Sequence, residues 1–475
     1  MSETSAPPSG PSLLIAVTGG PGASKTSLLA ELAAAQLARG QRVEGVLAIA
    51  GRRLIAGRGA EEYWLRLIGN DQELSWAVRD DHLVPPYHFE AETEKKVHAW
   101  AGRLASLPPP PLLILDEFGK FELAGRGLLP VWPVLLAARP QIVVIAVRAD
   151  LADQVEQLLG RRFDVRIAAG EPDALARLLR VTEDYGEWTR LGLIGGAAGG
   201  IEMSVGSALH AARIPARGLM MCSLQGAMMT FAGFGLAQPG RVIWVPFISA
   251  GLKALSPAGS RVRPMIAICA QGLLYGASVQ ALGWNAVGVT LGGALIGAWS
   301  ALQGVLLQYL LMGEDLVRAY DTTVLWVADH WGVQAPRLSV LLGAWALLCG
   351  LVAGAIAAVA WKLRAPPAAL RRIIEQEKSG VPAGRPHAGG RWREFAHWQF
   401  WLPLLLVSGI LLAAGRAWEN VAWLALRFVA VGFLLMTLVS FLRPARWAEY
   451  LRRRGWWGPA LAMAGAFSRR ETRKK

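Results

Sequence analysis

The sequence has only three cysteines among its 475 residues, Cys222, Cys269 and Cys349. All three lie inside apolar runs, which favours buried thiols over a disulfide framework or a cysteine-bound metal. The first twelve residues, MSETSAPPSGPS, lack the basic start and the apolar stretch of a signal peptide. We therefore expect residues 1–10 to be disordered and the following domain to lie in the cytoplasm.

Charged residues become scarce beyond about residue 188. Before that point charged and apolar residues are mixed as in a globular domain, and after it come long runs with hardly a charge. The whole chain is 53% hydrophobic and its mean hydropathy is +0.34. These values predict a soluble domain followed by a membrane part.

The formal net charge of +14 would suggest nucleic-acid binding in a soluble protein. Much of the positive charge, however, lies beside apolar segments, at residues 362–372, 391–393, 443–454 and 469–475. Cytoplasmic loops of membrane proteins have this composition. We therefore expect a lipid bilayer as partner, and no nucleic acid.

A glycine-rich segment near the N-terminus, LLIAVTGGPGASKTSLLAEL (13–32), is close to the phosphate-binding pattern G-x-x-x-x-G-K-[ST]. It predicts a strand, a turn and a helix whose N-terminus meets phosphates. The expected nucleotide-binding residues are Gly19, Gly20, Gly22, Ala23, Ser24, Lys25, Thr26 and Ser27. Lys25 would reach the terminal phosphates and Thr26 would bind Mg²⁺. Ser24 replaces the second glycine, which costs about 1 kcal/mol if the position requires a positive φ.

An acidic pair ends a second apolar segment, PLLILDEFGKFEL (111–123). Asp116 could hold Mg²⁺ and Glu117 could orient the attacking water, as nucleotide hydrolysis requires. Ordinary turns after strands are the alternative for either motif alone. Both motifs in one domain favour a nucleotide site, and the later segment QIVVIAVRAD (141–150) predicts a further strand of a parallel sheet covered on both faces.

The segments TGGPGASKTSLL and LDEFGKFEL resemble the nucleoside-triphosphatase family typified by small thermophile enzymes, over roughly residues 13–180. The resemblance implies a RecA-like α/β fold for residues 11–182 and hydrolysis of ATP or GTP with Mg²⁺. It implies that Lys25 and Glu117 are catalytic, that Thr26 and Asp116 hold the metal, and that Lys120 and Glu122 are second-line residues.

Two features depart from that family. One is Ser24, and the other is the segment after the first helix, where either Arg53 or Arg58 could supply the family's arginine. No L-S-G-G-Q-like segment occurs, so the domain is not an ABC-type ATPase.

Apolar runs dominate the rest of the chain. They occur at about 191–209, 216–236, 242–252, 264–283, 286–312, 338–361, 398–415 and 421–442. Most are close to the roughly 20 residues that span a bilayer, whereas the third is short and could be re-entrant. We expect a six-helix bundle over 190–362, a basic cytoplasmic linker over 363–396, two further spans over 397–442 and a basic cytoplasmic tail over 443–475. This is a multi-pass inner-membrane topology.

Polar residues interrupt these runs. The candidates for contacting a small-molecule substrate are Glu202, Gln225, Lys253, Gln271 and Asn285. Such groups are costly in a bilayer and usually face a cavity or a partner helix. Each glutamine could equally bond a neighbouring helix, whereas Glu202 requires a partner, a proton or a ligand.

The stretch WVPFISAGLKALSPAGSRVRPMIAICAQGLLYGASVQALGWN, with its six-run layout, resembles the substrate-binding (S) components of energy-coupling-factor vitamin transporters. The last two spans and LRPARWAEYL are similar to the end of that system's coupling protein. The resemblance implies capture of a vitamin-, cofactor- or metal-like substrate, with a coupling membrane protein or a second copy of the chain as partner.

Three functions stay open from the sequence. The first is a membrane-fused NTPase that couples hydrolysis to uptake of a small substrate. The second is a membrane-anchored nucleotide switch that regulates a partner transporter, and the third is a tethered kinase, against which the DEFGKFEL segment argues.

Overall fold

The computed structural model describes residues 13–51, 61–69, 72–83, 86–211, 216–253, 262–332, 337–379, 398–440 and 444–471. The chain divides into two compact units, the first Met1–Gly186 with Leu451–Leu461 and the second Glu187–Tyr450 with Ala462–Lys475. The predictions for residues 1–10, for Arg53 and Arg58, and for residues 380–396 of the linker fall outside the described residues.

The first unit is built on one eight-stranded mixed sheet, in the order β5-β4-β3-β2-β6-β7-β1-β8. Its strands are β1 (Leu13–Gly19), β2 (Val43–Ala50), β3 (Glu62–Leu67), β4 (Glu73–Arg79), β5 (Tyr87–Phe89), β6 (Leu112–Leu115), β7 (Ile142–Arg148) and β8 (Val165–Ala168). Strands β2, β6, β7, β1 and β8 run parallel to one another, as the alternation of strands and helices predicts.

The prediction of a wholly parallel sheet is wrong at one edge. Strands β3, β4 and β5 pair antiparallel with one another, and β3 pairs antiparallel with β2. Only short connections join β3 to β4 and β4 to β5, too short for the crossover helix that a parallel pair needs. The edge therefore folds as a meander.

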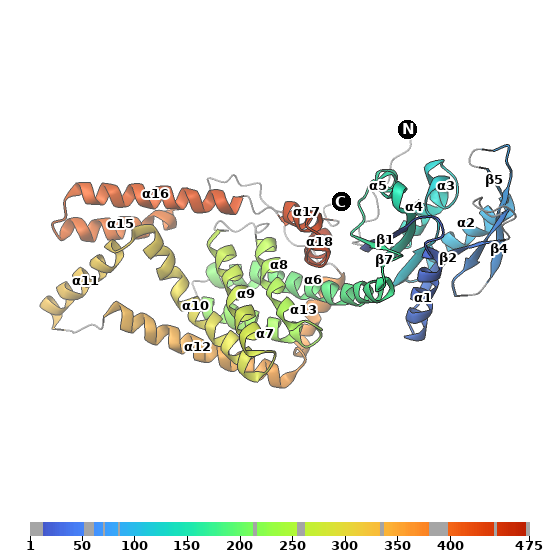
Figure 1. Cartoon of the computed structure of the whole chain (residues 1–475). Helices are drawn as coiled ribbons and strands as arrows, with labels where there is room; N and C mark the ends of the chain where they lie inside the picture. The colour runs from blue at the N-terminus through green and yellow to red at the C-terminus, as the bar shows by residue number, and fades with distance from the viewer. Residues whose placement is uncertain are drawn as a thin grey trace. The chain divides into compact units, whose positions relative to one another are not determined.

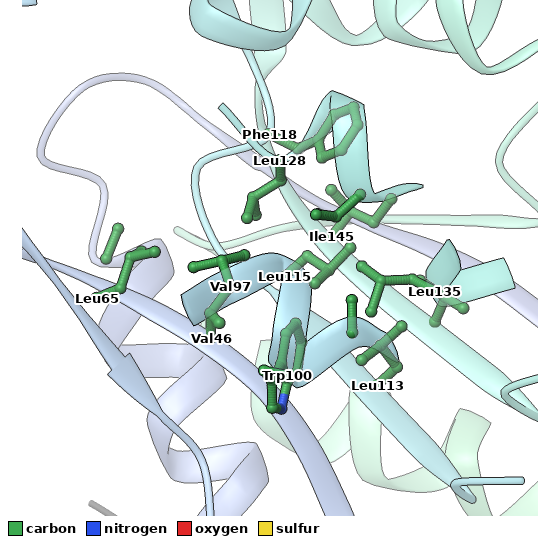
Figure 2. Close-up of a cluster of buried hydrophobic side chains, with 14 of the residues drawn as sticks. Val46, Leu65, Val97, Trp100, Leu113, Leu115, Phe118, Leu128, Leu135 and Ile145 are labelled. Carbon is green, nitrogen blue, oxygen red and sulfur yellow. The ribbon is translucent and has the colours of Figure 1, made fainter. Parts of the chain in front are cut away.

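Helices cover both faces of this sheet. They are α1 (Lys25–Ala38), α2 (Ala91–Ser106), α3 (Lys120–Leu123), α4 (Trp132–Ala137), α5 (Ala152–Leu159) and the first part of α6 (Ala174–Ala211). Figure 2 shows one core, in which Val97 and Trp100 of α2 and Leu135 of α4 lie over Leu113 and Leu115 of β6. Alternate strand residues such as Ile114 are also fully buried, on the opposite face. Burial on both faces explains why these strands are continuous apolar runs.

The strand order fixes where the two predicted motifs lie. The glycine-rich loop follows β1 and the acidic pair follows β6, with β7 between these strands. All three strands are parallel, so their carboxyl ends share one edge of the sheet. The fold therefore brings both motifs to that edge.

The second unit is helical (Figure 1). It contains the rest of α6, α7 (Arg217–Gly233), α8 (Trp244–Lys253), α9 (Val262–Leu282), α10 (Ala286–Met312), α11 (Asp315–Trp331), α12 (Leu338–Leu363), α13 (Ala368–Ser379), α15 (Trp398–Ala413) and α16 (Trp418–Ser440). The amphipathic helix α11 lies between two apolar runs, where the sequence analysis expected no element.

Three helices of the described chain are long and apolar enough to cross a membrane: Pro264–Leu282, Ala286–Met312 and Leu338–Leu363. The shorter helix Leu404–Ala413 is also apolar. They indicate a membrane protein, while the count of eight spans and the orientation stay predictions. Small residues let α10 and α12 approach closely, since a Cβ on Gly297 would lie 2.3 Å from the Cys349 carbonyl oxygen.

The predicted basic tail contains two helices, α17 (Pro444–Arg453) and α18 (Trp457–Glu471). Arg452 Nε lies 2.8 Å from Asp164 Oδ1, and the Asp164 side chain is only 4% exposed. The same carboxylate accepts a hydrogen bond from the Leu14 amide at the start of β1. A tail residue thus takes part in the folded first unit.

Candidate functional site

The glycine-rich loop joins β1, which ends at Gly19, to α1, which begins at Lys25. Ser24 is the N-cap of α1 with φ 55° and ψ 29°, in the left-handed region. Gly22 also has a positive φ, of 76°. The position that usually carries glycine in this pattern therefore does require a positive φ, and serine occupies it at a cost of about 1 kcal/mol.

Replacing Ser24 with glycine is expected to stabilise the first unit by about 1 kcal/mol, because glycine adopts a positive φ without steric penalty. For a unit of this size, the thermal midpoint of its unfolding should rise by about 2–4 °C. The measurement is thermal unfolding of the full chain in detergent micelles. Ser27→Gly, inside the first turn of α1, is the matched control and should destabilise the unit instead. A fall in the midpoint for Ser24→Gly would contradict the strain argument.

The loop faces open space. A Cβ added to Gly20 or to Gly22 would meet no heavy atom within 4 Å, and both glycines are exposed. The Lys25 ammonium folds back over the loop and donates hydrogen bonds to the carbonyl oxygens of Gly20 at 2.9 Å and Gly19 at 3.3 Å. An anion in the loop would offer this ammonium a stronger, charged partner.

Asp116 is the buried member of the acidic pair, only 2% exposed. Its carboxylate accepts hydrogen bonds from the amides of Glu117, at 2.9 Å, and Ala48, at 3.2 Å, and the Thr26 side chain lies close to it. Burial raises the pKa of the Asp116 carboxyl, while these hydrogen bonds and the charge of Lys25 act in the opposite direction. The fold thus brings the two predicted motifs together, with Thr26 of one near Asp116 of the other.

Thr26 and Asp116 are a fitting pair for magnesium. Mg²⁺ is usually held by one or two carboxylates together with substrate phosphates and water rather than by an all-protein cage. A hydroxyl and a carboxylate near each other, beside a loop that faces solvent, match that preference. No group of three or more His, Cys, Asp or Glu within the described ranges could hold a metal by itself.

Glu117, the predicted base, differs sharply from its neighbour. Its side chain is exposed, and its backbone lies at φ 58°. Positive φ is uncommon for glutamate, and such strain is concentrated at functional sites. The turn after β6 therefore buries one carboxylate and presents the other to solvent.

Glu122 has a defined structural task. It is 2% exposed, and its two oxygens accept hydrogen bonds from the amides of Gly119, at 2.6 Å, and Leu128, at 2.9 Å. Burial raises the pKa of its carboxyl. These contacts hold the turn that carries Glu117, whereas Lys120 begins α3 and is exposed. The second-line catalytic role of both residues stays a prediction.

Arg148 is a residue that the sequence analysis did not single out. It ends β7 and is paired with Gly19 in the parallel ladder, so it lies beside the first residue of the loop. The one sequence signal for Arg148 is its position at the end of a predicted strand. This strand is next to neither motif along the chain, so the sequence alone did not connect Arg148 with the site.

Among the predicted membrane residues, Glu202 of α6 and Lys253 of α8 come together. Lys253 is 4% exposed, and its Nζ lies 3.7 Å from Glu202 Oε1 and donates to the Glu202 carbonyl oxygen at 3.1 Å. Glu202 therefore has a positively charged partner, which lowers the cost of a carboxylate in an apolar region.

Gln271 of α9 also lies in this polar region. Its Nε2 donates to Cys222 Sγ of α7 at 3.0 Å, and Cys222 lies near Glu202. Gln225, one turn along α7, is 8% exposed, and its Nε2 has no hydrogen-bond partner among the described residues. Asn285 is different, because its side chain caps α10 by accepting from the Gly288 amide at 2.9 Å.

The chain was compared with protein-family models, curated proteins and solved structures. None of them matches. The two family resemblances therefore stay predictions, and what supports a function is the geometry of the loop, the acidic turn and the polar residues of the second unit.

Proposed function

We propose that the first unit binds ATP or GTP with Mg²⁺ in the loop Gly19–Ser27 and hydrolyses it. The observation that carries this proposal is the proximity of the Thr26 side chain to the buried Asp116 carboxylate, two residues 90 positions apart in the sequence. This proximity brings the exposed glycine-rich loop, which ends in Lys25, next to the carboxylates of Asp116 and Glu117. A RecA-like fold is part of the proposal, supported by the strand β7 between the loop strand and the acidic strand.

Each residue then has a distinct task. Backbone amides of the loop and the N-terminus of α1 bind the phosphates, and Lys25 leaves its carbonyl partners to neutralise them. Thr26 and Asp116 would hold a magnesium ion, which would supply positive charge beside the phosphates. Glu117, exposed at the turn, orients the attacking water and accepts its proton.

We further propose that hydrolysis is coupled to uptake of a small substrate by the helical unit. Helix α6 supports this, because one uninterrupted helix contains Thr182 of the first unit and Glu202 of the second. The far end of α1 is tied to α6 by Gln36, which donates to Thr182 Oγ1 at 2.8 Å, and by an ion pair from Arg39 to Glu183. A shift of α1 on nucleotide binding would therefore act on α6 directly.

A nucleotide-dependent switch is the second candidate. The observation in its favour is the strained Ser24 at the loop, together with a Lys25 that binds its own backbone. Stoichiometric nucleotide binding with a turnover far below about 1 s⁻¹, a low value for an enzyme, would support the switch over the transporter.

The test of nucleotide binding is calorimetry on the full chain in detergent micelles. The full chain is used because residues 451–461 belong to the first unit. We expect ATP or GTP to bind with 1:1 stoichiometry, and binding to weaken when EDTA removes Mg²⁺. Absence of binding heat for both nucleotides, in a sample with a cooperative thermal transition, would refute the proposed function.

A further inference from the structure

The carboxyl end of β7 lies between the two motifs of the proposed nucleotide site. Arg148, its last residue, is paired with Gly19 on one side. On the other side, the Phe118 amide donates to the Ala146 carbonyl oxygen at 2.9 Å, and a Cβ on Gly119 would contact Leu151 Cδ1 at 3.8 Å. The end of β7 and the residues after it therefore pack against the turn that carries Glu117.

Arg148 is held by a nearby carboxylate in a two-pronged contact. Its Nε lies 3.1 Å from Asp150 Oδ1 and its Nη2 lies 2.8 Å from Asp150 Oδ2. The two side chains are 34% and 58% exposed, so water and salt screen their attraction and the pair can exchange partners readily. A guanidinium fork fits two phosphate oxygens as well as it fits a carboxylate.

A triphosphate bound in the loop would extend its terminal phosphate towards Arg148. The loop amides and the start of α1 surround the inner phosphates, and Glu117 would hold water for attack on the outermost one. That phosphate must therefore lie between the loop after β1 and the turn after β6. Arg148 ends the strand between them. Lys120, whose charge reaches Asp150, adds positive potential at the same edge.

We propose that Arg148 is a sensor of the terminal phosphate: it leaves Asp150 when a nucleoside triphosphate binds and contacts the phosphate that a diphosphate lacks. This inference rests on the proposed nucleotide site and adds to it the means of distinguishing triphosphate from diphosphate. Asp150 is then the resting partner of the guanidinium, and hydrolysis returns Arg148 to it.

The experiment is calorimetry on the full chain in micelles with Mg²⁺ and either ADP or a non-hydrolysable ATP analogue. Arg148→Ala should weaken binding of the analogue about 10-fold or more, the effect of losing one charge-assisted contact, and leave ADP affinity within about 2-fold. Asp150→Asn should strengthen analogue binding, because the competing carboxylate is gone. Arg66→Ala is the matched control, since Arg66 forms a similarly exposed ion pair with Glu73 at the far edge of the sheet, and should change neither affinity.

The outcomes separate two failures. If the wild-type chain binds neither ligand, the proposed nucleotide site is wrong. If it binds both, and Arg148→Ala weakens both equally or neither, the sensor is refuted and the Arg148–Asp150 pair only fixes the turn after β7. Should Arg148→Ala lose its cooperative thermal transition, Arg148→Lys and Asp150→Asn decide, and unchanged analogue affinity in both would overturn the proposal.

Discussion

Replacing Lys25 with alanine is expected to lower the rate of ATP and GTP hydrolysis by about 10²–10³-fold, the usual cost of removing one charged group that stabilises the transition state. Lys25 is a cation at the mouth of the loop, and its ammonium donates hydrogen bonds to the carbonyl oxygens of Gly19 and Gly20. Nucleotide affinity should fall about 10-fold as well. Release of inorganic phosphate by the full chain in lipid nanodiscs measures the rate.

Lys95→Ala is the control for this variant, because Lys95 is an exposed lysine of α2 in an ion pair with Glu92 and away from the loop. It should hydrolyse nucleotide at the wild-type rate. A Lys25→Ala chain that folds and hydrolyses nucleotide as fast as the Lys95→Ala chain would show that another site performs the reaction.

The same variant tests the coupling to transport. A small molecule that co-purifies with the full chain, identified by mass spectrometry, supplies the substrate for an uptake assay in vesicles. Uptake should be lost in Lys25→Ala together with hydrolysis. Uptake at the wild-type rate, with hydrolysis abolished, would refute the coupling. It would not contradict the proposed nucleotide site.

Replacing Glu117 with glutamine is expected to lower hydrolysis by about 10²–10⁴-fold, the range of general acid–base catalysis, while nucleotide binding stays within about 2-fold of wild type. The amide keeps the size of the side chain and loses the ability to accept a proton. We expect turnover and binding to separate because the exposed Glu117 is assigned to the attacking water, whereas the buried Asp116 is assigned to the metal. Single-turnover phosphate release and calorimetry on the same samples measure the two quantities.

Glu73→Gln is the matched control for the glutamate variant, because Glu73 is exposed on β4 and its side chain forms an ion pair with Arg66. Equal rates for Glu117→Gln and Glu73→Gln would exclude Glu117 as the base. A loss of nucleotide binding in Glu117→Gln would instead make Glu117 a metal or phosphate contact, and the assignment of Asp116 as the metal carboxylate would need revision.

Local sequence patterns predicted several elements well. The apolar run ending at Gly19, the helix after Thr26 and the strand before Asp116 all lie where the sequence placed them. The sequence left open whether the position of Ser24 requires a positive φ, and the structure shows a φ of 55° there. These are local features, set by side chains and backbone torsions within a few residues.

Other features needed contacts between distant segments. The antiparallel meander β3–β4–β5 was missed because strand direction depends on the length of each connection and on which edge is free. The amphipathic α11 was missed because its charges interrupt the apolar signal. Asn285 looked like a polar residue within a span, but its side chain caps α10.

The sequence by itself determined that a glycine-rich loop with Lys25 and Thr26, an acidic pair and a series of apolar helices are present, because each depends on residue type and spacing. Only the tertiary structure decided which of them meet. Asp116 lies near Thr26, Arg148 lies beside Gly19, and Lys253 pairs with Glu202. The members of each pair are far apart in the sequence, and strand order and helix packing bring them together.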